Sequence, residues 1–369
     1  MRFICDRSKL SEALLNVSKA VSDRSTIPSL ESIKFDLEEN TLKLTGYDLE
    51  LGIRTSLEVK STDKASFLAG SRLFSEMVRK MPEGSIEIIL DDNMMLTIKQ
   101  DDTEYSMNAL PADDYPELPG KESSEPISIA QSVLKSMIVQ TKFAASQLDI
   151  KPILKGELFE IGEGKAVLAA IDGYRLAVRY EPIGFEGSTS FVVPAKNLDE
   201  VAKLLSDEDD CVCNMFLAKK HIIFEVGNYL VSSRLLEGEF HPYKNAIPSG
   251  HTTEIVIERT KLINTLERCM LLISEKSPSP VRCRFENGQL RIKCHTPSVG
   301  RINDSLDVEM TGNPIEIGFK CRYFLDPLKA VSDEKVKLQI GGNLQPMKIV
   351  PLEGDKYIYL VLPVRLPKE

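Results

Sequence analysis

The sequence repeats one order of elements three times over its 369 residues. Each copy opens with a short strand-like segment, followed by apolar residues at i, i+3 or i+4 and i+7, which is the spacing of one helix face. The three openings read RFICDRSKLSEALLNVSKAV, PISIAQSVLKSMIVQTKFAAS and EIVIERTKLINTLERCMLLIS. A repeat on this scale predicts three similar domains rather than one large domain.

The rest of each copy indicates how such a domain is built. Two alternating apolar segments surround a short turn, which reads EENT, GEGK or ENGQ, and Gly and Asn in such turns favour tight strand connections. A second helical segment and further short strands follow, so each copy holds two helices and roughly eight strands. This order predicts an α+β fold in which the helices pack on antiparallel sheets. Pro-rich stretches lie near residues 120 and 250, so we expect domains at 1–120, 121–249 and 250–369.

The expected helices differ in charge from the rest of the chain. They cover residues 7–20, 71–82, 131–147, 194–206, 259–276 and 320–333, and Pro327 is expected to kink or restart the last one. These segments hold 17 basic and eight acidic residues, a net charge of +9, whereas the whole chain carries −9 and the remainder therefore −18. If all six helices share one side of an assembly, that side would attract a phosphate backbone. Alternatively, these side chains only solvate exposed helix faces.

The stretch LAAIDGYRLAVRY, residues 168–180, combines a turn with unusual neighbours. Asp172-Gly173 between apolar runs predicts a tight hairpin turn with positive φ at both central residues. Tyr174 and Arg175 follow at once, although a bare turn requires neither. They are interpreted either as a surface turn pair or as part of a catalytic or binding surface.

Motifs of catalysis and cofactor binding are absent from the sequence. GEGK at 162–165 lacks the upstream Gly and the Ser or Thr of a phosphate-binding loop, and GxSxG, HExxH and GxGxxG do not occur. The acidic run at 207–210 favours a solvated loop over a magnesium site, because Mg²⁺ demands octahedrally arranged oxygens. We therefore expect no cofactor and no metal.

Cysteine usage and the N-terminus indicate the compartment. Seven Cys without a CxxC pair suit reduced, mostly buried thiols in a cytosol. The first residues lack a signal-type apolar core, and no apolar run of 18 residues suggests a membrane span.

Taken together, the threefold repeat and the segments LPADDYPELP, IDGYRLAV, LLEGEFHPYKNAIP and YLVLPVRL resemble the bacterial sliding clamps, the beta subunits of DNA polymerase III. The resemblance covers the whole chain in order. It implies a head-to-tail homodimeric ring of six domains that encircles duplex DNA without reading its sequence. It also implies a cytoplasmic, nucleoid-associated processivity factor that is not an enzyme. The implied partners are the polymerase III alpha subunit, the clamp loader delta subunit, and other polymerases and repair proteins with clamp-binding motifs.

The resemblance also implies roles for individual residues. The partner-binding groove would comprise Leu154, Ile171, Gly173, Tyr174, Arg175, Leu176, Asn245, Ala246, Val361, Leu362, Pro363, Val364, Arg365 and Leu366. The family usually has Thr where this chain has Ile171, and residues 367–369 extend past the usual end, where they could touch the groove. Contacts to DNA would come from Arg24, Arg72, Lys196 and Gln147, with Leu148 at the family's usual glutamine position. The dimer seam would join Tyr105 and Met107 to Leu271 and Leu272.

Two other classes of function remain open from the residues alone. A hydrolase using Asp172 and a histidine is disfavoured, because no nucleophile accompanies them in a local motif. A repeat-built scaffold that does not bind DNA is the second alternative. For the dimer seam, the alternative is that Leu271 and Leu272 are core residues, although neighbours on a helix cannot both point fully inward, so at least one is available to a partner.

Overall fold

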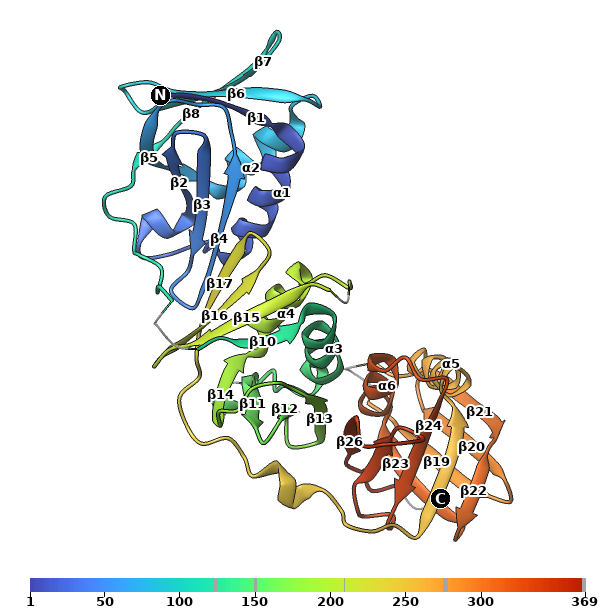
Figure 1. The fold of residues 1–369 in the computed structure, drawn as a ribbon. Helices are drawn as coiled ribbons and strands as arrows, with labels where there is room; N and C mark the ends of the chain where they lie inside the picture. Colours follow the sequence, from blue (N-terminus) through green and yellow to red (C-terminus); the bar gives the residue numbers. More distant parts are fainter. Residues whose placement is uncertain (122–124, 149–150, 209, 275–277, 367–369) are drawn as a thin grey trace. The chain divides into compact units, whose positions relative to one another are not determined.

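The computed structural model describes residues 1–121, 125–148, 151–208, 210–274 and 278–366. The chain forms two compact units, one made of residues 1–134 and 200–235, the other of residues 135–199 and 236–369. Both consist of antiparallel sheets and helices (Figure 1), so the predicted α+β fold is confirmed. No helix of the described residues is long and apolar enough to cross a membrane.

The first unit contains two sheets. The smaller has the order β1 (Arg2–Asp6), β6 (Ser85–Leu90), β7 (Met95–Gln100), β8 (Thr103–Asn108). The larger has the order β10 (Ile127–Ala130), β15 (Val212–Leu217), β16 (His221–Val226), β17 (Tyr229–Arg234), β4 (Leu51–Glu58), β3 (Thr41–Tyr47), β2 (Ser32–Glu38), β5 (Lys64–Gly70), β9 (Leu110–Pro111). Since β17 pairs with β4, this sheet joins strands of the first and second repeats.

The second unit is also built on two sheets. The larger runs β14 (Thr189–Pro194), β11 (Gly156–Gly162), β12 (Lys165–Ile171), β13 (Arg175–Pro182), β26 (Tyr357–Val361), β25 (Met347–Val350), β24 (Lys335–Ile340), β18 (Thr253–Glu258), β22 (Glu309–Gly312). The smaller runs β21 (Gly300–Asp307), β20 (Gln289–Thr296), β19 (Pro280–Glu286), β23 (Ile315–Lys320). Here the pairing of β13 with β26 joins the second and third repeats.

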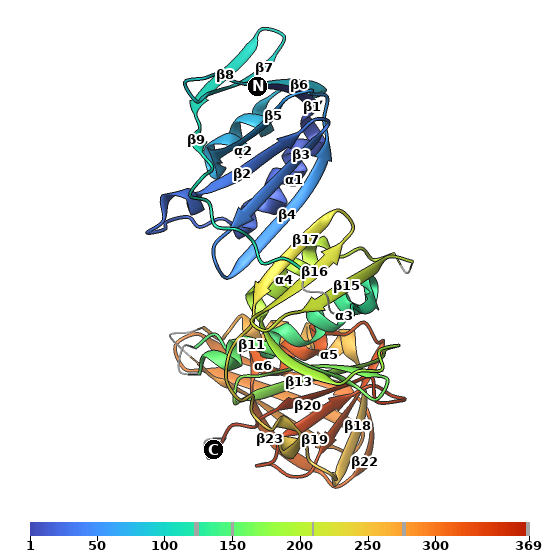
Figure 2. The same cartoon turned by 60° about the vertical axis from the view of Figure 1, so that its left-hand side comes forward.

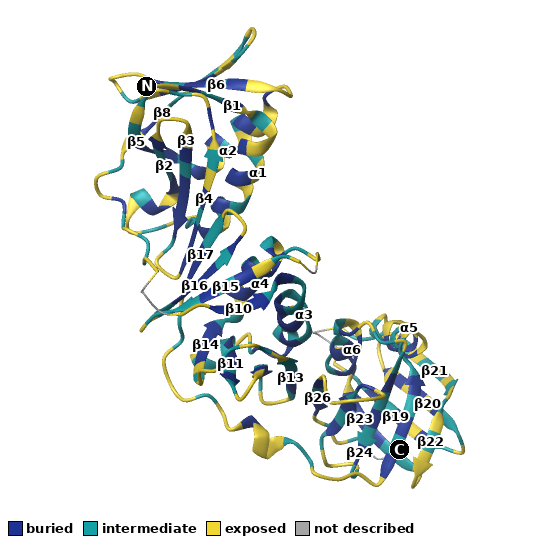
Figure 3. Ribbon diagram, in the orientation of Figure 1, coloured by how far each residue is buried: buried dark blue, intermediate teal, exposed yellow. Residues whose placement is uncertain are grey.

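In the described part of the chain, each repeat contributes two α-helices. They are α1 (Arg7–Val17), α2 (Ser71–Lys80), α3 (Gln131–Thr141), α4 (Ala195–Leu204), α5 (Arg259–Met270) and α6 (Cys321–Ala330). In the first unit α1 packs on α2 and on β3 and β4, and Figure 2 shows the two helices beside that sheet. In the second unit α5 packs on α6, β20 and β21. Burial follows this packing: Figure 3 shows buried residues along the strands of both units.

The helices are shorter than the sequence predicts, and one of them continues past a proline. Helices α1 and α3 end in separate 3-10 turns, Ser18–Ala20 and Lys142–Ala144, so the apolar spacing persists where the α-helix has ended. The expected restart at Pro327 is wrong, because α6 continues through it. Proline there removes only one intrahelical bond, near the C-terminus, and its ring is buried. Within these bounds the six helices hold 13 basic and six acidic residues, a net +7, which leaves −16 for the rest.

A buried carboxyl group lies behind α3. Glu157 of β11 is fully buried, and one of its carboxyl oxygens contacts the hydroxyl of Thr141, which in turn donates to the carbonyl of Met137 at 2.8 Å. Burial raises the pKa of Glu157 to about 8, against smaller lowering effects from Thr141 and Lys142. The carboxyl group is therefore mainly protonated at neutral pH, and its oxygen accepts from the hydroxyl of Thr141 in α3.

This carboxyl group predicts a pH-dependent stability. The folded-state pKa of Glu157 lies above its ordinary value of 4.5. Its contribution to the free energy of unfolding is therefore fully present below about pH 4.5 and is lost as the pH rises through about 8. The slope between these values is about 1.4 kcal/mol per pH unit. Glu157→Gln keeps the shape but cannot ionise, so its free energy of unfolding should fall less between pH 6 and pH 8.5 in urea titrations. Equal pH slopes for the variant and the wild type would contradict the assignment.

Candidate partner-binding groove

The hairpin between β12 and β13 turns at Gly173 and Tyr174, one residue later than expected: the backbone N–H of Asp172 donates to the carbonyl of Arg175 at 3.3 Å, and side-chain hydrogen bonds of Asp172 add to this closure. Oδ1 of Asp172 accepts from the backbone N–H groups of Tyr174 and Arg175 at 2.8 and 3.0 Å. Only Gly173 has positive φ, +89°, so the expectation of positive φ at Asp172 is wrong. The carboxylate of Asp172 reinforces the turn, as short acidic side chains do in such loops.

A groove of about 600 Å³ adjoins this turn. Its floor belongs to an apolar cluster in which Ile171, Leu176 and Leu360 are almost fully buried. A 3-10 turn, Tyr243–Ala246, supports one side. Burial and a hydrogen bond to Glu160 raise the pKa of Tyr243, whose hydroxyl donates to that carboxylate at 2.6 Å and fixes the turn. A concave, mostly apolar site with few polar groups is typical of ligand binding.

Half of the expected groove residues line this groove. They are Leu154, Ile171, Gly173, Arg175, Leu176, Ala246 and Leu362. They come from the second and third repeats, which the pairing of β13 with β26 brings together.

The other expected groove residues lie elsewhere. Tyr174 lines a second cavity, Asn245 is exposed on the 3-10 turn, and Val361 is fully buried in β26. After Leu362 the chain runs along β23: Val364 donates to the carbonyl of Gly318 at 2.8 Å, and a Cβ on Gly318 would lie 2.5 Å from Leu366. The groove lining accordingly does not include Pro363, Val364, Arg365 and Leu366. Residues 367–369 lie outside the described part of the chain.

Sequence reasoning missed other lining residues. These are Lys151, Ile153, Glu239, Phe240, His241, Pro242, Pro346 and Leu360. The segment 239–242 lies in the Pro-rich stretch near the second domain boundary, where only Asn245 and Ala246 are expected from the sequence to belong to the groove. Phe240 and Pro242 could have indicated this part of the groove, because apolar side chains in a linker are unfavourable when they stay exposed to water.

A second cavity of about 900 Å³ lies on the other side of the turn. Tyr174 and Arg175 line it together with Gln147, Tyr323 and Asp326. Arg175 therefore borders both cavities. Its guanidinium lies 4.6 Å from the Tyr323 ring centre, within the range of a cation–π interaction.

The residues expected to contact DNA are all exposed. Arg24 follows the 3-10 turn after α1, Arg72 opens α2, Lys196 opens α4, and Gln147 follows the 3-10 turn after α3. Within the described residues, no hydrogen bond or ion pair involves the side chains of the three cations. They are therefore available to an anionic partner.

The residues expected at the dimer seam lie on one strand and one helix end. Tyr105 and Met107 are half-buried on β8, the last strand of its sheet. Leu271, directly after α5, is 82% exposed, whereas Leu272 is half-buried and packs on the core of its own domain. Of this adjacent pair, Leu271 is thus the residue that faces outward.

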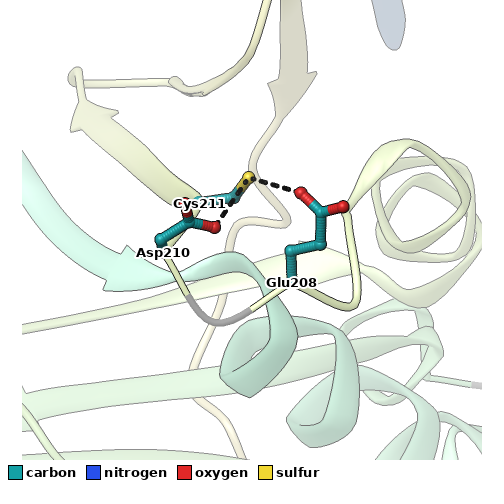
Figure 4. A group of neighbouring side chains, drawn as sticks. All are labelled: Glu208, Asp210 and Cys211. Carbon is teal, nitrogen blue, oxygen red and sulfur yellow. Dashed lines mark hydrogen bonds between the residues drawn. The ribbon is translucent and has the colours of Figure 1, made fainter.

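The described residues of the acidic run, Asp207, Glu208 and Asp210, are exposed and lie between α4 and β15. Figure 4 shows Glu208 and Asp210 beside Cys211, whose sulfur lies 3.8 Å and 3.9 Å from their carboxylate oxygens. Asp209 lies outside the described residues. Glu208 and Asp210 are exposed and Cys211 half-buried, as in a solvated loop, so we assign no site to the cluster.

Comparison with known proteins gives a consistent result over the whole chain. Models of the N-terminal, central and C-terminal domains of the DNA polymerase III beta subunit match residues 1–119, 128–242 and 244–365. The beta sliding clamp of Halalkalibacterium halodurans is 31% identical, covering 99% of this chain and 100% of that protein; the clamp of Bacillus subtilis is 29% identical over the same shares.

Solved structures give the same result. The crystal structure of the Bacillus subtilis DNA polymerase sliding clamp has a TM-score of 0.95 at 28% identity, covering 100% of both chains. The Pseudomonas aeruginosa clamp bound to griselimycin has a TM-score of 0.93 at 29% identity, covering 99% of this chain and 100% of that one. The three domain matches, in order, account for the threefold repeat and both joined sheets: the chain belongs to the DNA polymerase III beta subunit family, the bacterial sliding clamps.

Proposed function

We propose that two copies of this chain close head to tail into a ring around duplex DNA, and that the groove beside the β12–β13 turn binds the proteins held there. As a sliding clamp, the chain is a processivity factor of the replicative polymerase and not an enzyme. The observation that carries the ring proposal is the way in which successive repeats pair.

The two junctions between repeats have the same register. Val231 of β17 lies opposite Ile53 of β4, and Tyr359 of β26 lies opposite Ala177 of β13. Val231 and Tyr359 occupy equivalent positions in their repeats. In each repeat, the residue four positions before the first helix is linked to this position by the same succession of strand pairings. Ile53 and Ala177 are likewise equal, since each lies opposite the sixth residue of the preceding strand, β3 or β12.

The same positions occur once more, on two sheet edges. Tyr105 of β8 is the third equivalent of Val231 and Tyr359. Ile302 of β21 is the third equivalent of Ile53 and Ala177. Within the described residues, β8 and β21 end their sheets without a partner on the outer side. Exposed strand edges favour pairing with another chain.

The repeat therefore predicts the register of an antiparallel pair between two copies. Tyr105 would lie opposite Ile302, and Met107 opposite Gly300, beside Leu272. Half-buried and exposed residues alternate in both strands, and this register sets half-buried residues opposite half-buried ones. Two such seams close six domains into a ring.

The charge of the helices supports DNA as the content of the ring. A net +7 on the helices of a chain of −9 favours a phosphate backbone on the helix side only. Contacts to phosphate groups do not depend on the base sequence, so a clamp that makes only such contacts can slide along the DNA.

Replacing Arg24, Arg72 and Lys196 by Glu should weaken retention on DNA and lower its salt dependence. Each lost phosphate contact reduces the slope of log affinity against log salt by roughly 0.9. DNA retention is measured between 50 and 200 mM salt, with sedimentation to check that the dimer persists. Glutamate substitution of Lys43, Lys64 and Lys99, which are ion-paired on strands, serves as the matched control. An unchanged salt slope for the helix variant would argue that these side chains do not face DNA.

The groove is proposed to bind short linear motifs. Its apolar floor suits apolar anchors of a peptide, whereas Arg175 and Lys151 at its edge add polarity. The polymerase III alpha subunit, the clamp loader delta subunit, and other polymerases and repair proteins with such motifs are the proposed partners. This role places the protein in the cytoplasm, on the nucleoid.

A further inference from the structure

The turn formed by Asp172, Gly173 and Tyr174 separates the groove from the second cavity. Gly173 faces the groove, whereas Asp172 and Tyr174 face the second cavity. The backbone N–H of Leu362, which also lines the groove, donates to the carbonyl of Tyr174 at 2.9 Å. The position of this turn therefore sets the shape of one groove wall.

The charge of Arg175 is already satisfied within the protein. Its Nε donates to Oδ2 of Asp172 at 2.9 Å, and its Nη1 donates to Oδ2 of Asp326, on α6, at 2.5 Å. The side chains of Arg175 and Asp326 are 10% and 23% exposed, so solvent screens this pair only partly. The ring of Phe143 lies on the same guanidinium, with 5.6 Å to its centre. The guanidinium is thus held in place rather than left free for a ligand.

Tyr174 is held from the same helix and from the residue that precedes this helix, the last of β23. Its ring centre lies 5.9 Å from that of Tyr323, and Nζ of Lys320 lies 4.6 Å from its ring centre. Among the described residues of α6 that line the second cavity, Asp326 is the only acidic one. Its other ion pair, to Arg322, is longer, at 3.9 Å, with Arg322 76% exposed.

We propose that Asp326 is a positioning residue of the groove: it fixes the guanidinium of Arg175 and, through Asp172, the turn that forms the groove wall. This inference rests on the proposed function of the groove as a peptide site. Asp326 does not itself line the groove. It acts by keeping the turn in the conformation that a peptide needs.

The first test measures peptide affinity. Asp326→Ala should weaken a fluorescent Gln-x-x-Leu-Phe peptide roughly tenfold, because apparent affinity falls with the fraction of molecules whose groove is binding-competent. Asp326→Asn keeps an acceptor for the guanidinium of Arg175, so it should retain most of the affinity that Asp326→Ala loses. If Asp326 acted only through its negative charge, the two variants would lose affinity equally. Glu267→Gln is the matched control: it breaks the ion pair between Glu267 and Lys329 of α6, and should leave affinity unchanged.

The second test does not depend on any peptide. The amides of Tyr174 and Arg175 are hydrogen-bonded to Asp172, so their exchange with deuterium reports opening of the turn. Asp326→Ala should speed this exchange roughly tenfold, in line with the same loss of the closed population. Exchange in β19 and β20 of the same unit should stay at the wild-type rate.

The outcomes separate this inference from the proposed function. Wild-type affinity in Asp326→Ala, or an equal loss in Glu267→Gln, overturns the inference. If the wild-type chain binds no such peptide, the proposed function of the groove fails. The exchange rate of the turn then decides the positioning role: faster exchange supports it, and unchanged exchange overturns it.

Discussion

A chain truncated after Val361 is expected to lose nearly all affinity for clamp-binding peptides while remaining a dimer. The truncation removes Leu362 from the groove lining, together with its hydrogen bond to Tyr174. It also removes the contact of Val364 with Gly318 that anchors the tail to β23. Loss of a central apolar anchor costs about 2 kcal/mol or more, which is roughly thirtyfold in affinity. Fluorescence anisotropy with a labelled peptide measures the change.

Three comparisons sharpen this result. A chain truncated after Leu366 keeps the anchor and the β23 contact, so its peptide affinity should equal that of the full chain. Tyr174→Ala should cost less than the longer truncation, about 1–2 kcal/mol, because it trims the wall that faces the second cavity. The dimer should survive, since β23 and the seam strand β21 are opposite edges of one sheet. Full peptide affinity after truncation, or a truncated chain that is monomeric, would refute this assignment of the tail.

Leu271→Asp is expected to convert the dimer into folded monomers. Leu271 is 82% exposed in the single chain, so the substitution should cost little in domain stability. In the dimer it would place an unpaired carboxylate in a packed seam, at about 3 kcal/mol or more, which is over a hundredfold in the dissociation constant. Sedimentation should then show 41.2 kDa species where the wild type gives twice that mass.

The choice of residue makes this test specific. Leu272 packs on its own domain, so an aspartate there would also destabilise the monomer. Leu15 of α1, which is 59% exposed, offers a matched control, and Leu15→Asp should leave the dimer intact. A Leu271→Asp protein that sediments as the wild type does would show that the seam lies elsewhere.

The fold was predictable because the repeat is carried by local signals. The helix periodicity and the turns recur in all three copies, and Glu39, Glu163 and Asn287 take positive φ at matching places. The ends of the helices were less predictable, since the apolar spacing of α1 and α3 continues into 3-10 turns. Pro327 shows that burial of a side chain can outweigh a local breaker.

The groove was only half predictable, and the reason is its non-local construction. Ile171 and Leu362 come together through the pairing of β13 with β26, which no local pattern specifies. The course of the tail after Leu362 depends on the close approach that Gly318 permits. The ion pair between Arg175 and Asp326 joins residues 151 positions apart, so it was not visible in the sequence.

The central claim, that the chain holds DNA by encircling it, is tested most directly by changing the topology of the DNA. Protein assembled by a clamp loader and ATP on a nicked circular plasmid is separated from free protein by gel filtration, before and after the plasmid is cut once. We predict that the protein elutes with the circular DNA and is released when the DNA is linearised, because a ring slides off a free end. Retention that is equal on circular and linear DNA would contradict encirclement and indicate ordinary surface binding.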